Sequence, residues 1–209
     1  MVGIEYCEKA IYSGYLEPIN FFSNLFIIAA ALSILAYMKK HKIKDIKSKV
    51  LVSLVFLTGI GSMSWHLIQT APTLLLDILP VMIFIFTSIY LIFQKITKNN
   101  TKAAAALAII FAIIPLFVWA SSLLLNISTN GPPFLGIIPA LAFTVGFIYY
   151  KDKETFKRTL LPLSFFAAAI FFRQIDLIAC NIIPFGTHFM WHLMNSFAAY
   201  YLFLAVYER

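Results

Sequence analysis

The segment Ile19–Met38 reads INFFSNLFIIAAALSILAYM, and Lys39–Lys49, which follows it directly, reads KKHKIKDIKSK. A run of about 20 mostly apolar residues is long enough for a helix to cross a lipid bilayer. A lysine cluster directly after such a run is typical of the cytoplasmic end of a membrane helix. This segment therefore predicts a membrane-spanning helix that starts outside the cell and ends in the cytoplasm.

Further apolar segments follow along the rest of the chain, each long enough to be a candidate span. We therefore predict an all-α bundle of seven membrane helices over residues 19–209, preceded by an acidic outer segment over residues 1–18. The predicted spans are Ile19–Met38, Val50–Ile68, Leu74–Phe93, Ala103–Leu124, Phe134–Tyr150, Thr159–Ile175 and Gly186–Tyr207.

The composition agrees with a membrane protein, because 61% of the 209 residues are hydrophobic and only 12% are charged. Soluble domains carry about 25% charged residues. The net charge of +7 raises the question of nucleic-acid binding. However, the lysines occur in short runs between apolar segments, whereas a nucleic-acid site needs a basic face on a soluble fold. We therefore predict no nucleic-acid partner.

The basic residues also predict the orientation of the chain. Fourteen of the sixteen Lys and Arg residues lie after the first, third, fifth and seventh predicted spans, and the alternate loops contain none. Basic loops remain in the cytoplasm, so the N-terminus is predicted outside and the C-terminus inside. The short loops suggest a bacterial protein of the inner (cell) membrane.

Polar residues within the apolar spans are the candidates for function, because an ionisable side chain in lipid is costly unless it is paired or bound. With the predicted orientation, all of these residues fall in the outer half of the membrane. Arg173 and Asp176 are expected to pair with each other or with Glu17. The set consists of Glu17, Asn20, Ser23, Asn24, Ser62, His66, Asp77, Arg173, Asp176, His188 and His192.

Three histidines of this set predict a metal site. His188 and His192 are four residues apart, so they project from one face of a helix, a spacing that offers two imidazoles to one metal. His66 lies at a similar depth on another span. Three His ligands with an open fourth position are typical of catalytic zinc. The alternative is that these side chains only hydrogen-bond neighbouring helices.

Two further residues are candidates for catalysis beside these histidines. Asp77 faces His66 across the predicted hairpin of the second and third spans, where a carboxylate could accept a proton or orient a ligand. Ser62 lies one turn from His66 on the same helix face, and its hydroxyl could donate a hydrogen bond to a developing oxyanion.

The two cysteines both belong to the predicted outer side. Cys7 precedes the first span and Cys180 follows the sixth. Because the outer side can be oxidising, we predict a disulfide that ties the acidic N-terminal segment over the site. The alternative is a pair of free thiols.

Three blocks of sequence resemble the alkaline ceramidase family, which is related to adiponectin-type receptors and GPI-remodelling proteins. They are EPINFFSN over Glu17–Asn24, GSMSWH over Gly61–His66 with LDILP over Leu76–Pro80, and RQID over Arg173–Asp176 with HFMWH over His188–His192. The resemblance covers nearly the whole chain. It implies a zinc-dependent amidase that splits a ceramide-like lipid into a fatty acid and a sphingoid base. On this resemblance the zinc ligands are His66, His188 and His192, with Asp77 acting on the water and Ser62 beside the metal.

The same resemblance implies a calcium site in the N-terminal segment. Its ligands here would be Glu5, the Tyr6 carbonyl, Glu8 and Glu17, while Ala10 stands where the family has an Asn ligand. The alternative for these glutamates is a solvated acidic segment.

The predicted partner is a membrane lipid, namely ceramide or another N-acyl lipid, in a site near the outer leaflet. No obligate protein partner is evident. The alternatives are a lipid esterase of the same superfamily and a seven-helix receptor or sensor with structural zinc. A retinal protein is disfavoured because the seventh span has no Lys. A transporter is disfavoured because the inner half lacks polar groups.

Overall fold

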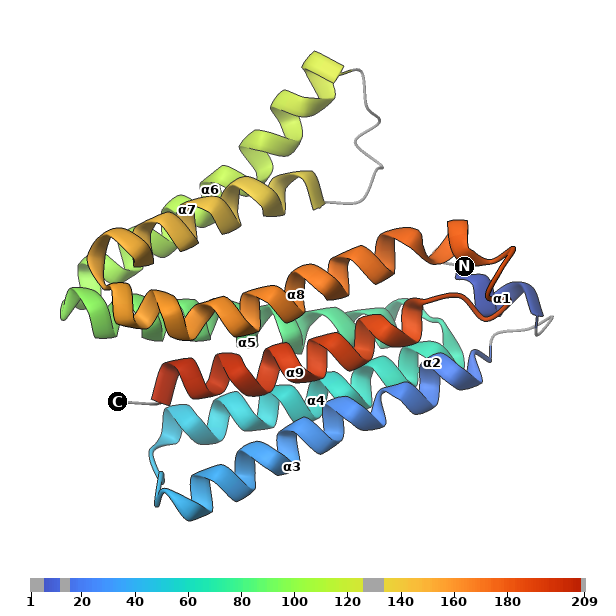
Figure 1. Cartoon of the computed structure of the whole chain (residues 1–209), viewed down its shortest axis with the longest axis horizontal. Helices are drawn as coiled ribbons and strands as arrows, with labels where there is room; N and C mark the ends of the chain where they lie inside the picture. Colours follow the sequence, from blue (N-terminus) through green and yellow to red (C-terminus); the bar gives the residue numbers. More distant parts are fainter. Residues whose placement is uncertain (1–5, 12–15, 126–133, 208–209) are drawn as a thin grey trace. The chain divides into compact units, whose positions relative to one another are not determined.

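The computed structural model describes residues 6–11, 16–125 and 134–207, and every regular element in these ranges is an α-helix (Figure 1). The absence of strands from these ranges agrees with the predicted all-α class. The helices are α1 (Cys7–Ile11), α2 (Pro18–Ser23), α3 (Leu25–Lys40), α4 (Ile46–Ile68), α5 (Ala71–Thr97), α6 (Asn100–Leu125), α7 (Phe134–Lys151), α8 (Lys153–Ala179) and α9 (His188–Tyr207).

Six stretches of helix within the described residues are long and apolar enough to cross a membrane. They correspond to all the predicted spans except the fifth, and α2 and α3 together make the first of them, Pro18–Lys40. Helix α7 stands at the position of the fifth predicted span. The chain is therefore a multi-pass membrane protein by length and composition, while the count of seven and the orientation stay predictions.

Most described helices begin a few residues away from the predicted starts, and local backbone features account for the difference at α8 and α9. Helix α8 begins at Lys153, six residues before the predicted Thr159. The reason is a cap, because Asp152 Oδ1 accepts hydrogen bonds from the backbone N–H groups of Glu154 and Thr155 at 3.0 and 3.3 Å. Helix α9 begins at His188, after Gly186 at a φ of 70°. Hydropathy does not detect such capping groups, so it placed both starts approximately.

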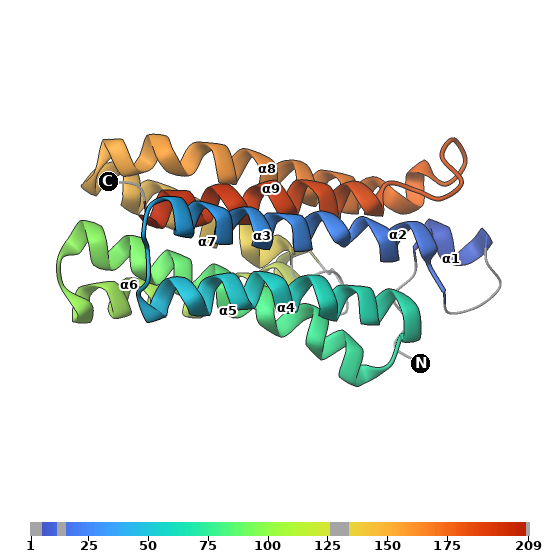
Figure 2. The same cartoon turned by 90° about the horizontal axis from the view of Figure 1, so that it is seen from below.

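The chain divides into two compact units. The first unit comprises Met1–Ile85 and Thr159–Arg209. In it, α3 packs against both α4 and α9, and α2 also packs against these two helices. Its apolar core includes the fully buried side chains of Ile34, Leu51 and Phe203. In Figure 2, α1, α2 and the α8–α9 connection lie at one end of this unit, and the α3–α4 turn lies at the other end.

The second unit comprises Phe86–Arg158, where α6 packs against α7. Aromatic rings contact one another in this unit, both in its interior and nearer its surface. Phe93 is fully buried, with its ring 4.8 Å from that of Phe147, and the rings of Phe86 and Phe111 are 4.4 Å apart. Many other large apolar side chains of the chain are exposed, as expected of helices that face lipid.

Candidate metal centre

The three predicted histidines meet at one end of the first unit. His66 lies in the last turn of α4, and His188 and His192 lie in the first two turns of α9. All three are almost fully buried, and one ligand atom of each lies within 4.8 Å of the others. Buried imidazoles at this spacing from two helices can hold one metal ion.

Glu17 fixes the orientation of His66. Its Oε2 atom is 2.6 Å from His66 Nδ1, and its other oxygen accepts from Gln69 Nε2 at 2.5 Å. The Glu17 backbone N–H also donates to the His66 carbonyl at 3.1 Å. An ionised carboxylate only accepts, so Nδ1 of His66 carries the proton and Nε2 keeps its lone pair.

Ser23 orients His192 in the same manner. Its hydroxyl oxygen is 2.7 Å from His192 Nδ1, and it donates its only proton to the Asn20 carbonyl at 2.8 Å. Ser23 must then accept from His192, so Nδ1 of His192 is protonated. The lone pair of this ring therefore lies on Nε2.

The free ring nitrogens indicate that a metal fits here. His66 Nε2 and His188 Nδ1 are buried and have no hydrogen-bond partner among the described residues. A buried nitrogen without a partner is costly, and a metal ion would satisfy it. Three neutral imidazoles form a donor set that suits zinc.

Ser62 and Asp77 contact each other across the hairpin of α4 and α5, while the roles predicted for them at the histidines stay predictions. Ser62 is buried one turn before His66, and its hydroxyl donates a hydrogen bond to the half-buried Asp77 carboxylate. Gly61 allows this approach, because a Cβ atom at this position would collide with the backbone of Leu76 on α5.

Tyr6 and Arg173 also lie at the site. The sequence analysis placed both residues on the outer side, but it did not indicate that their side chains contact each other. The Tyr6 ring is 4.1 Å from the ring of His188 and 5.4 Å from that of His66. The guanidinium of Arg173 donates to the Tyr6 hydroxyl at 3.3 Å and lies 5.3 Å from the Trp191 ring. Tyr6 therefore covers the histidines, and a cationic side chain holds it there.

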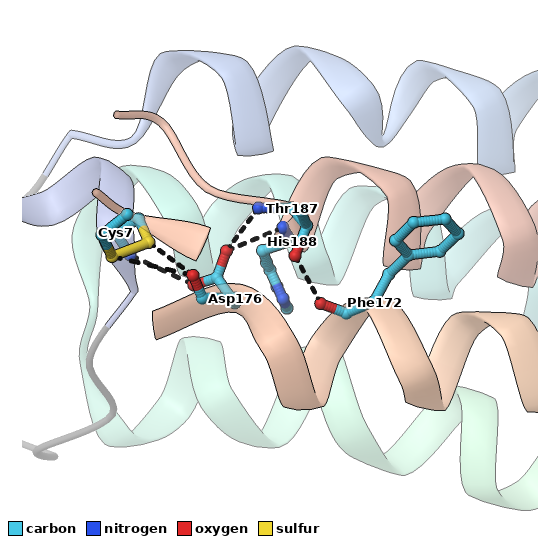
Figure 3. Close-up of a disulfide and its surroundings, with 6 residues drawn as sticks. Cys7, Phe172, Asp176, Thr187 and His188 are labelled. Carbon is cyan, nitrogen blue, oxygen red and sulfur yellow. Dashed lines mark hydrogen bonds between the residues drawn. A yellow bond between two sulfur atoms is a disulfide. The ribbon is translucent and has the colours of Figure 1, made fainter. Parts of the chain in front are cut away.

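The predicted disulfide is present between Cys7 and Cys180, with a Cα–Cα distance of 5.4 Å. Asp176, expected to pair with Arg173 or Glu17, instead uses both carboxylate oxygens on backbone groups. Oδ2 accepts from Cys7 N at 3.1 Å, and Oδ1 accepts from the amides of Thr187 and His188 at 2.7 and 2.9 Å (Figure 3). Asp176 thus joins α1 to the start of α9.

The predicted calcium ligands have other partners. Glu8 Oε1 accepts from Ile19 N at 2.5 Å and Oε2 accepts from Asn20 N at 2.9 Å. The Tyr6 carbonyl accepts from Lys9 N at 3.2 Å, and Glu5 lies outside the described residues. Burial raises the pKa of the Glu8 carboxyl, and the two amides oppose this effect. Among the described residues, these oxygens therefore serve as hydrogen-bond acceptors for N–H groups.

Sequence reasoning did not assign the roles of Asn20, Ser23, Gln69 and Trp191 at this site. Asn20 and Ser23 were noted as polar residues of the first span, but their partners depend on how the chain enters α2. Gln69 follows α4 in the left-handed conformation, with a φ of 53°. A polar residue at the end of a span was the only signal for it.

The family model described as Ceramidase matches residues 2–207, which is nearly the whole chain. Comparison with curated proteins finds no significant match.

Proposed function

Because the chain belongs to the ceramidase family, we propose that it is a zinc-dependent membrane hydrolase that cleaves the amide bond of ceramide or a related N-acyl lipid. The family match supports hydrolysis of an amide. The observation that carries the metal dependence is the cluster of three buried histidines, with ligand atoms within 4.8 Å of one another.

The zinc ligands in this proposal are His66, His188 and His192. Zinc, when bound, supplies a Lewis acid and lowers the pKa of a coordinated water to about 7. Glu17 and Ser23 hold two of the rings with their Nδ1 protons directed away from the centre, which leaves Nε2 for the metal. Tyr6 and the disulfide close the outer end of the site over His188.

Asp77 is the proposed acid–base group. Its carboxylate takes the proton of the attacking water as the water oxygen bonds to the amide carbon. The Asp77 carboxylate then gives this proton to the departing amide nitrogen as the C–N bond breaks. A fatty acid and an amine leave. Ser62 positions this carboxylate through its hydrogen bond. For the Ser62 hydroxyl to donate to the developing oxyanion of the substrate, its hydrogen bond to Asp77 would first have to break.

The surroundings support a lipid substrate. The helices expose many large apolar side chains, among them Leu75, Leu76 and Leu79 of α5 near Asp77 in the sequence. A lipid amide could therefore reach the site from the bilayer. With the orientation proposed from the basic loops, the site lies near the outer leaflet, and the source is proposed to be a bacterial inner membrane.

The test combines metal analysis with lipid mass spectrometry. Purified protein should contain about one zinc and release a fatty acid and a sphingoid base from a ceramide panel. His188→Ala should lose both properties. His41→Ala is the matched control, because His41 is exposed in the α3–α4 turn, and it should keep both.

Two results would overturn the proposal in different ways. Cleavage of lipid esters without cleavage of any amide would identify an esterase of the same superfamily. Stoichiometric zinc without cleavage of either bond would favour a receptor in which the zinc is structural.

A further inference from the structure

We propose that Glu8 and Glu17 support the metal ligand His66 through N–H groups instead of a calcium ion, with Glu17 as the positioning residue. This inference rests on the proposed metal site, and it adds that the site assembles without calcium. The observations behind it are hydrogen bonds and buried side chains of the first unit.

Glu17 is tied to His66 at two points. Its Oε2 atom accepts from His66 Nδ1 at 2.6 Å, and its backbone N–H donates to the His66 carbonyl at 3.1 Å. The side chain of Glu17 is fully buried, so solvent does not compete for these bonds. Glu17 therefore sets both the tautomer and the direction of the ring.

Two amides hold Glu17 in turn. Asn20 Nδ2 donates to Oε2 at 3.1 Å, and Gln69 Nε2 donates to Oε1 at 2.5 Å. Gln69 lies three residues after His66 and is itself buried. The carboxylate thus bridges the start of the first span and the end of α4.

Glu8 fixes the segment that carries Glu17. Its two oxygens accept the amides of Ile19 and Asn20 in the first turn of α2. The Glu17 side chain does not cap α2, because it is used on His66. Glu8 supplies this capping function from α1, which the disulfide at Cys7 attaches to the end of α8.

A calcium ion would have to compete with these N–H donors for the same four oxygens. Calcium takes six to eight oxygen ligands at about 2.3–2.6 Å. All four carboxylate oxygens of Glu8 and Glu17 already accept from N–H donors, and such donors repel a cation. The two carboxylates therefore act as hydrogen-bond acceptors that join α1, α2 and α4.

The test measures metal affinity and needs no catalytic turnover. Metal-free protein is titrated with Co²⁺ in competition with a chelating dye, and the visible spectrum of the Co²⁺ form is recorded. Glu17→Gln should weaken Co²⁺ affinity about 10–100-fold and shift the spectrum, because loss of a group that orients a ligand typically has this effect. Glu154→Gln, at an exposed glutamate of α8, is the control and should change neither.

A second arm tests calcium directly. Calcium chloride is added to protein that has been freed of divalent ions on a chelating resin. The melting temperature and the Co²⁺ affinity of the wild type should not change. An increase in either would overturn the proposal and show that the carboxylates form a cation site.

The remaining outcomes are also decisive. Wild-type Co²⁺ affinity and spectrum in Glu17→Gln would reject its positioning role. If that variant does not fold, Gln69→Ala replaces it, because it keeps Glu17 but removes one of its two anchors. Gln69→Ala should lose affinity several-fold, and a folded Gln69→Ala with unchanged affinity would reject the proposal. Failure of ceramide cleavage alone would affect the proposed function and leave these results standing.

Discussion

Asp77 and Ser62 carry the first prediction at the residue scale. Asp77→Asn keeps the size of the side chain, but an amide cannot accept a proton at neutral pH. We expect the variant to retain zinc and to lose turnover about 10²–10⁴-fold, the usual contribution of an acid–base group. Zinc content by mass spectrometry and lipid cleavage measured on the same preparation check this.

The control for that substitution is Ser62→Ala, which removes only the hydrogen bond to the carboxylate and should cost less activity than Asp77→Asn. Loss of zinc from Asp77→Asn would make Asp77 a ligand or an orienter of a ligand. Full activity with full zinc would refute the acid–base role.

At the same scale, the sequence predicted the histidines because polar residues are rare in apolar spans and stand out there. The partners of those histidines were not predictable in the same way. The contact of Glu17 with His66 joins residues 49 positions apart, and that of Ser23 with His192 joins residues 169 positions apart. Such pairs depend on the packing of α2 against α4 and α9, which no local pattern encodes.

At the element scale, Gly61 controls the distance between α4 and α5. A Cβ atom at Gly61 would collide with the backbone of Leu76, so Gly61→Ala must push the two helices apart. Because Asp77 follows Leu76, the hydrogen bond from Ser62 should weaken as well. Overpacking of this kind costs about 1–3 kcal/mol. A lower melting temperature together with reduced lipid cleavage would confirm this.

Gly59→Ala is the matched substitution on the same helix. Its Cβ atom would meet the end of the Ile28 side chain at 2.6 Å, and a flexible side chain can move. We expect a clearly smaller loss of stability and no loss of cleavage. Equal effects of the two substitutions would contradict the steric explanation.

The start of α4 provides a second prediction at the element scale. Asp45 Oδ1 accepts from Ser48 N at 3.0 Å and from the Tyr207 hydroxyl at 2.9 Å, joining the ends of α4 and α9. Loss of such a cap costs about 0.5–2 kcal/mol. Asp45→Ala should therefore lower the melting temperature at neutral pH, whereas Asp45→Asn, which can still cap, should lower it less.

The pH dependence of this contact has a defined sign. Burial raises the pKa of the Asp45 carboxyl, but the hydrogen bonds from Ser48 and Tyr207 outweigh it and hold the pKa below its usual value. A lowered pKa stabilises the fold above the pKa of the unfolded chain, about 3.9 for Asp. The advantage of the wild type over Asp45→Asn should disappear as the pH falls below about 4. Calorimetry in detergent, at pH values above and below about 4, measures this difference in stability between the wild type and Asp45→Asn.

Hydropathy predicted the helices well because each span must cover about 20 apolar residues. It did not predict α1, since five residues, Cys7–Ile11, are too few for a periodic pattern. This helix depends on contacts with distant residues, namely the disulfide to Cys180 and the hydrogen bond to Asp176. Its position was therefore open until the fold was known.

For the whole molecule, the prediction concerns orientation. A membrane-impermeant thiol reagent applied to intact cells should label Ser128→Cys in the outer loop predicted between the fourth and fifth spans. It should not label Lys44→Cys in the α3–α4 turn. Labelling of both residues after the membrane is permeabilised serves as the control. The opposite pattern would place the histidine cluster on the cytoplasmic side.

Both substitutions test the prediction that the lysine-rich loops lie on the cytoplasmic side of the membrane. Lys44 belongs to the lysine-rich turn at the end of the first unit opposite the histidines (Figure 2). Ser128 lies outside the described residues, so only its sequence position places it.

The disulfide also has a consequence for the order of events during translation. Cys7 and Cys180 are 173 positions apart, and at about 5–20 residues added per second α1 is made roughly 9–35 s before its partner. Asp176, which binds the Cys7 amide, and His188, beneath Tyr6, are made equally late. The nascent chain must therefore insert nearly all its spans before the N-terminal segment can be fastened. Helix α1 is thus made early but is among the last elements to reach its final position.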